Sequence, residues 1–181
     1  MNNRLSENDA KLVFEEMFAK WNAALQTAFD NIQEVNRTHP KGTPGRDAAL
    51  LKAVDPIVNC YTKDATLMPT LQNEICTTPE EIGRYFIHFA EKNPKGTITK
   101  MKLFVKSDNE IFVIGDYRFD LKDPTTKEPS SAMCNYTYNI VQDTDSGEWK
   151  WGGHVSRLFP VPLPEEPKRE QKPAGNKNAF H

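Results

Sequence analysis

Apolar residues recur at intervals of three and four positions in the first part of the chain. Between about residues 7 and 35 they are Phe14, Met17, Phe18, Trp21, Leu25, Phe29 and Ile32. This spacing keeps side chains on one face of an α-helix. Ser6, followed by Asp9, resembles a capping box at the start of the pattern. The sequence therefore predicts a long amphipathic helix, followed by an exposed loop over residues 37–47, where proline, glycine and charge are concentrated.

A second helix is predicted over residues 48–61, with a break inside it. Asp55 is expected to cap a restarted helix, and Pro56 suits the first helical position. The following segment, residues 65–76, is short and interrupted by Pro69. Proline cannot donate to a sheet ladder, so this segment is predicted to form an edge strand and a turn.

A third helix is predicted from Thr78 to about Lys92. Thr78 can cap it, Pro79 fits its first position, and Glu81 can return a hydrogen bond to the cap. After residue 97 the hydrophobic period changes to two, which predicts strands at about 98–106, 110–121, 131–142 and 148–158. Helices followed by a run of strands indicate an α+β domain with a mostly antiparallel sheet.

One face of the predicted sheet is rich in aromatic residues, namely Tyr117, Phe119, Tyr136 and Tyr138. Strand 110–121 also has apolar residues on its other face, so both faces need an explanation. The first explanation is that the protein's own helices wrap more of the sheet, or that strands near a barrel mouth bury both sides; the second is that another copy of the chain covers the aromatic face. We favour the second explanation, which predicts a homo-oligomer with these four residues in its interface.

Composition narrows the choice of partners. The formal net charge of −2 and the isoelectric point near 6.1 give no electrostatic reason to expect nucleic acid or an acidic membrane surface as a partner. The three cysteines lie far apart without a CxxC pair, so neither a metal site, nor another cofactor, nor a disulfide framework is predicted. Without a signal core or a long apolar run, a cytoplasmic location is expected.

The domain is predicted to end near residue 159. Residues 160–181 are rich in proline and charge and poor in apolar side chains, so they are expected to form a disordered tail. Residues 1–159 are then one domain.

Four segments together resemble the association, or hub, domain of calcium/calmodulin-dependent protein kinase II, within the nuclear transport factor 2-like superfamily. They are YTKDATLMPT (61–70), TTPEEIGRYFIHF (77–89), PKGTI (94–98) and GEWKWGGHVSR (147–157). The resemblance implies a cone-shaped, cystatin-like fold in which a long N-terminal helix and two further helices pack on a curved sheet around a cavity. It also implies self-association, as a dimer or a larger even-numbered ring. Met1 lies only a few residues before the first helix, so a stand-alone hub without a kinase domain is expected.

The resemblance further implies an arginine-bearing cavity. Arg84, Arg118 and Arg157 match arginines of the hub pattern, and His154 matches a hub histidine, whereas Asn135 stands where another arginine is expected. Converging guanidinium groups would bind a small carboxylate. Two alternatives remain open at this stage: Arg84 could instead form a surface ion pair with Glu80, and His154 could be a hydrogen-bonded residue of the sheet.

An enzymatic function is the alternative to a hub. Asp116 and His154 on neighbouring strands could act as acid and base, as in isomerases, dehydratases and cyclases of this superfamily. The sequence shows no nucleophile motif to support this alternative, and one Asp and one His pair readily by chance. A self-associating domain is therefore the preferred function.

Overall fold

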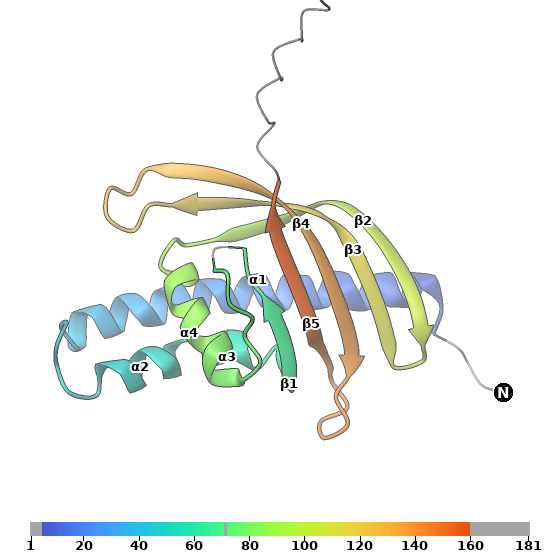
Figure 1. The fold of residues 1–181 in the computed structure, drawn as a ribbon, viewed down its shortest axis with the longest axis horizontal. Helices are drawn as coiled ribbons and strands as arrows, with labels where there is room; N and C mark the ends of the chain where they lie inside the picture. The colour runs from blue at the N-terminus through green and yellow to red at the C-terminus, as the bar shows by residue number, and fades with distance from the viewer. Residues whose placement is uncertain (1–4, 71, 160–181) are drawn as a thin grey trace, which may run out of the picture.

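The computed structural model describes residues 5–70 and 72–159. Its longest element is α1 (Glu7–Thr38), which begins where the sequence predicts and runs three residues further. The Ser6 side chain caps it by accepting a hydrogen bond of 3.1 Å from the backbone N–H of Asp9. Figure 1 shows α1 crossing the strands of a curved sheet.

Three shorter helices lie alongside the C-terminal half of α1 (Figure 1). They are α2 (Arg46–Ala53), α3 (Asp55–Val58) and α4 (Pro79–Ala90). The predicted break near Pro56 is confirmed, but the cap is Val54, and Asp55 is already helical. Thr78 and Glu81 form the predicted capping box of α4.

The sheet has the strand order β1-β5-β4-β3-β2, which places β4 at its centre. Its strands are β1 (Tyr61–Met68), β2 (Lys95–Ser107), β3 (Glu110–Lys122), β4 (Pro129–Gln142) and β5 (Trp149–Leu158). β1 runs parallel to β5, and the other neighbours are antiparallel. The α+β class and the mostly antiparallel sheet are therefore as predicted.

The sheet face that packs against α1, here called the inner face, holds the aromatic side chains. Tyr117, Tyr136 and Tyr138 are fully buried there, and Phe119 is 4% exposed. Phe14 of α1 stacks on Tyr136 with ring centroids 6.0 Å apart, and Phe18 lies 6.4 Å from Tyr117. The expectation that these four residues form an interface between copies is wrong, because α1 of the same chain already covers them.

The two edges of the sheet differ. β2 is a long edge strand, and its four lysines, Lys95, Lys100, Lys102 and Lys106, are exposed. At the opposite edge, the chain after β1 folds back, and Leu67 and Cys76 exchange two backbone hydrogen bonds of 2.9 Å. This contact covers part of the β1 edge.

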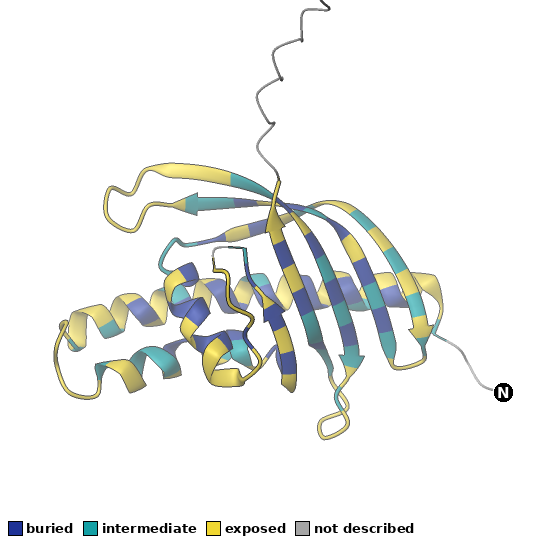
Figure 2. Ribbon diagram, in the orientation of Figure 1, coloured by how far each residue is buried: buried dark blue, intermediate teal, exposed yellow. Residues whose placement is uncertain are grey.

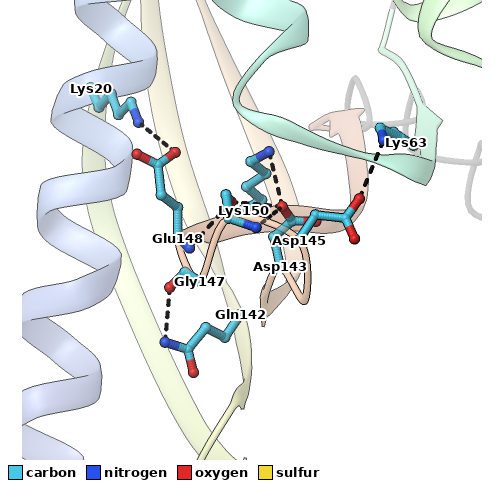
Figure 3. A network of polar contacts seen from close by, with 9 residues as sticks. Lys20, Lys63, Gln142, Asp143, Asp145, Gly147, Glu148 and Lys150 are labelled. Carbon is cyan, nitrogen blue, oxygen red and sulfur yellow. Dashed lines mark hydrogen bonds and ion pairs between the residues drawn. The ribbon is translucent and has the colours of Figure 1, made fainter.

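The turn between β4 and β5 is tied to its surroundings by ion pairs (Figure 3). Glu148 pairs with Lys20 of α1 at 3.7 Å, and Asp145 pairs with Lys63 of β1 at 3.3 Å. Within the hairpin, Asp143 pairs with Lys150 at 3.3 Å. These contacts link the turn to both the first helix and the first strand.

The predicted disordered tail, residues 160–181, lies outside the described residues. Among the helices of the described part of the chain, none combines the length and the apolar character that crossing a membrane requires.

Candidate functional site

Inside the cone, a chain of polar side chains runs through the aromatic core. Tyr61 Oη lies 2.9 Å from His154 Nδ1, and Tyr117 Oη lies 3.5 Å from His154 Nε2. Tyr117 also donates a hydrogen bond of 2.5 Å to Ser156 Oγ, which in turn contacts the Thr70 hydroxyl. His154 is thus a hydrogen-bonded residue of the inner sheet face.

Burial keeps this cluster uncharged. Desolvation lowers the pKa of His154 to about 3, because the interior disfavours the imidazolium form. The same effect raises the pKa of Tyr61 and of Tyr117 well above the usual value for a phenol. At neutral pH the cluster is a network of neutral hydrogen bonds, and it presents no charge to a ligand.

Little space remains beside the cluster. The cavity bordered by Trp21, Tyr117 and His154 measures about 10 Å³. A single water molecule needs roughly 10–15 Å³. Trp21 borders this space, and its Nε1 has no hydrogen-bond partner among the described residues. The interior is therefore filled by the protein's own aromatic side chains, and a carboxylate ligand does not fit.

The arginines predicted to line this cavity all lie outside it. Arg84 is half exposed on α4, where it pairs with Glu80 at 2.9 Å and with Asp47 of α2 at 3.1 Å. Hydrogen bonds to these two carboxylates raise the pKa of Arg84. The alternative of a surface ion pair is the correct one, because Arg84 projects from α4 toward α2 and away from the buried stripe of its helix.

Arg118 and Arg157 lie on the sheet face opposite α1, here called the outer face. Side chains alternate along a strand, so the buried neighbours Tyr117 and Ser156 place Arg118 and Arg157 on the other side. Arg118 pairs with Asp120 at 3.1 Å. The sequence correctly put both arginines on one face, but this face does not line the interior.

Asp116 and His154 do not form an acid–base pair. Asp116 belongs to the outer face, where its Oδ1 accepts a hydrogen bond of 2.7 Å from Asn135 Nδ2. His154 is buried on the inner face. The sheet itself separates the two side chains.

A shallow hollow of about 480 Å³ lies on the outer face over β2, β3, β4 and β5. The strand register arranges its lining in rows across the sheet. The first row is Lys100, Asp116, Asn135 and Arg157, in which each residue is the register partner of the next. The second row, built in the same way, is Lys102, Ile114, Thr137 and Val155. Directly opposed side chains have Cβ atoms about 4.5–5.5 Å apart, so each row is a contiguous strip.

Apolar side chains on this face are left open. Phe104, Ile114 and Val155 are 38–43% exposed, and Figure 2 shows exposed and intermediate positions alternating with buried ones along the strands. Of the residues predicted to bind a ligand, Asn135 and Arg157 meet here, and Tyr136, predicted for the interface, also borders the hollow. Sequence reasoning missed Lys100, Lys102, Ile114 and Val155, although the period of two in these strands already separates them from the aromatic face.

Comparison with solved structures places the fold among known ones. The chain is similar to a protein from Xanthomonas campestris that is provisionally described as a calcium/calmodulin-dependent protein kinase II association domain. The TM-score is 0.65 and the identity 25%, covering 86% of this chain and 89% of that one. No protein-family model matches the chain, and no curated protein matches it in sequence.

Two more distant structures share the fold only. One is a nuclear transport factor 2-like protein with a cystatin-like fold from Novosphingobium aromaticivorans, at a TM-score of 0.55 and 5% identity, covering 84% of this chain and 83% of that one. The other, from the same species, is provisionally described as a scytalone dehydratase, at a TM-score of 0.59 and 12% identity, covering 84% and 88%. The predicted cystatin-like fold is therefore confirmed, and the predicted resemblance to association-domain proteins is found among the structural neighbours.

Proposed function

We propose that the chain is a self-associating domain whose copies pack together through the outer face of the sheet. The observation that carries this proposal is a set of open apolar side chains on a face that no described helix covers: Ile114 and Val155 lie on either side of Thr137 in the second row, and Phe104 lies one row away. Exposed apolar side chains gathered on one face of a sheet are typical of an interaction surface. A symmetric pair would remove this surface from water on both copies at once.

The structural comparison supports the same proposal. The Xanthomonas campestris protein is described as an association domain, and the similarity extends over most of both chains. The sequence prediction of a homo-oligomer is thus retained, with its interface moved from the inner face to the outer face.

The test is the particle mass of the purified protein, measured by native mass spectrometry and light scattering. Ile114→Lys places a charge in the middle of the proposed interface, and we expect it to reduce the wild-type particle to monomers because an unpaired ammonium would be buried there. Leu12→Lys is the matched control, since Leu12 is 56% exposed on α1, far from the outer face. It should leave the mass unchanged.

A wild-type protein that stays monomeric at micromolar concentration would overturn the proposal. So would an Ile114→Lys variant that keeps the wild-type mass. The far-ultraviolet circular dichroism of each variant shows whether its fold is intact.

Two earlier hypotheses are not part of this proposal. Carboxylate binding inside the cone required converging arginines and an open cavity, and the structure has the arginines outside and a cavity of about 10 Å³. Acid–base catalysis by Asp116 and His154 required the two side chains to share a face, which they do not.

A reducing compartment such as the cytoplasm remains our proposed location. Cys60, Cys76 and Cys134 are all free and buried. Unpaired thiols are the usual state of cysteine in the cytosol.

A further inference from the structure

We propose that two copies pack about a two-fold axis running along β4, so that Asp116 of each copy pairs with Arg157 of the other. This inference rests on the proposed function, because it specifies how the outer faces meet. It names the residues that would select one arrangement among the many that two apolar sheet faces allow.

The strand order determines the geometry of such a pair. β4 is the middle strand of the five, with β3 on one side and β5 on the other. A two-fold axis along β4, lying between the two sheets, keeps each residue at its height along the strands and reverses the order of the strands. β4 then faces β4 of the second copy, and β3 faces β5. Stacked sheets lie about 10 Å apart, within reach of facing side chains.

The first row becomes complementary in charge under this operation. Asp116 on β3 comes to face Arg157 on β5 of the second copy, and the symmetry repeats the pair on the other side of the axis. Within one copy, neither side chain has an ion-pair partner among the described residues, although Asp116 accepts the hydrogen bond from Asn135. Each copy therefore offers a carboxylate and a guanidinium without an ion-pair partner of its own, at matching positions.

The second row becomes complementary in shape. Ile114 on β3 faces Val155 on β5 of the second copy, so the two exposed aliphatic side chains cover each other. Thr137 lies on β4 between them and faces its own copy across the axis.

A third row, formed by Phe112, Asn139 and Gly153, places a large side chain opposite a glycine. Phe112 on β3 comes to face Gly153 on β5 of the second copy, because both are register partners of Asn139. A glycine leaves room for the ring, whereas a side chain there would crowd it. The same two-fold axis along β4 therefore produces all three contacts: the carboxylate with the guanidinium, Ile with Val, and Phe with Gly.

An axis running across the strands gives a poorer fit. It keeps the strand order and reverses the rows, so that β3 faces β3. An axis over the second row would bring Asp116 onto Phe112 of the second copy, and an axis over the first row would bring Asp116 onto Asp116. Both arrangements place a carboxylate against an unfavourable neighbour.

Charge reversal tests the pairing directly. Asp116→Arg and Arg157→Asp should each be monomeric alone, because each variant sets like charges against each other. Mixed in equal amounts, the two variants should form a heterodimer with wild-type-like affinity. The two introduced side chains then face each other with opposite charges, and the unchanged Arg157 of one variant faces the unchanged Asp116 of the other. Native mass spectrometry, with one variant carrying a short mass tag, distinguishes this heterodimer from either homodimer.

Lys100 provides the matched control. It shares the first row with Asp116 and Arg157, but under the proposed axis it faces the β1 side of the second copy. Lys100→Asp should therefore not restore pairing when it is mixed with Asp116→Arg.

The outcomes separate the two proposals. A monomeric wild type overturns the proposed function and this inference with it. If the wild type associates and Ile114→Lys disrupts it, but the mixed reversal variants stay apart, the function stands and the axis along β4 is wrong. Rescue by Lys100→Asp would also overturn the axis.

A double-mutant cycle keeps the inference testable if a reversed variant fails to fold. Asp116→Ala and Arg157→Ala each remove one partner. Their combined effect on the dimer dissociation constant should be clearly smaller than the product of the single effects. Independent, multiplicative effects would contradict the pairing.

Discussion

His154 shows how one buried side chain links stability to pH. Its pKa is about 3 in the folded protein and 6.5 in an unfolded chain. Between these values the unfolded state takes up a proton that the folded state does not. The free energy of unfolding should therefore fall as the pH drops below about 6.5. This one group accounts for a decrease of up to ~1.4 kcal/mol per pH unit. Above that pH, the stabilisation that comes from the neutral imidazole is fully present.

The measurement is urea unfolding of the wild type and of His154→Gln between pH 4 and pH 7. The variant should be less stable at neutral pH, and its curve should be flatter across this range. Carboxylates that titrate in the same range are present in both proteins and cancel in the comparison. Parallel curves would mean that the imidazole accepts a proton without penalty in the folded state.

Gly115 is a residue whose lack of a side chain is required by packing. A Cβ there would lie 2.0 Å from the carbonyl oxygen of Lys100 and 2.7 Å from Tyr136 Oη. We expect Gly115→Ala to lower the free energy of unfolding by about 3 kcal/mol or more, because backbone must move to make room.

Gly83→Ala is the control for this substitution. Its Cβ would lie 3.4 Å from the nearest atom, on Leu51, and alanine favours the helix it sits in. Chemical denaturation should show equal or higher stability. A similar loss in both variants would contradict the explanation from close packing.

Arg84 marks the limit of sequence reasoning for a single residue. Its helix position correctly predicted Glu80 as a neighbour, because residues four apart lie on one face. Its second partner, Asp47, is 37 positions away in sequence, and only the folded arrangement of α2 against α4 brings it close.

At the level of elements, local signals determined most boundaries. The capping box of α4 was readable because all of its parts lie within four residues, and the structure contains each of its hydrogen bonds. The boundaries of strands, which depend on pairing with a neighbouring strand, were harder to predict from the sequence. β2 starts at Lys95, three residues before its predicted start, because Lys95 and Gly96 pair with Asp120 and Phe119 of β3.

The cap of α4 also gives a quantitative prediction. Thr78→Ala removes the acceptor of the Glu81 backbone N–H, a bond of 3.2 Å. The free energy of unfolding should fall by ~1 kcal/mol. Thr27→Ala in the middle of α1, where the hydroxyl bonds only to the backbone of its own helix, should have little effect in the same thermal or chemical unfolding experiment.

At the level of the whole molecule, the sequence correctly predicted helices packed on one sheet. It was wrong about the aromatic face, which α1 covers and which the prediction had assigned to a second copy of the chain. The period of two correctly separates the aromatic face from the other, yet nothing local states which face a distant helix will cover. Phe14 and Phe18 of α1 make that choice by packing onto Tyr136 and Tyr117, more than 90 positions away in sequence. The arginines were assigned to the interior for the same reason.

The edges of the sheet bear on how large a particle can grow. A long strand with free backbone groups invites other chains to add to it, which leads to fibres. Along β2, four exposed lysines oppose such addition by repulsion and by the energy needed to remove water from them. At the other edge, the return of the chain to Cys76 occupies part of β1. The proposed contact between outer faces uses neither edge, and a two-fold contact of that kind closes on itself after two subunits instead of propagating.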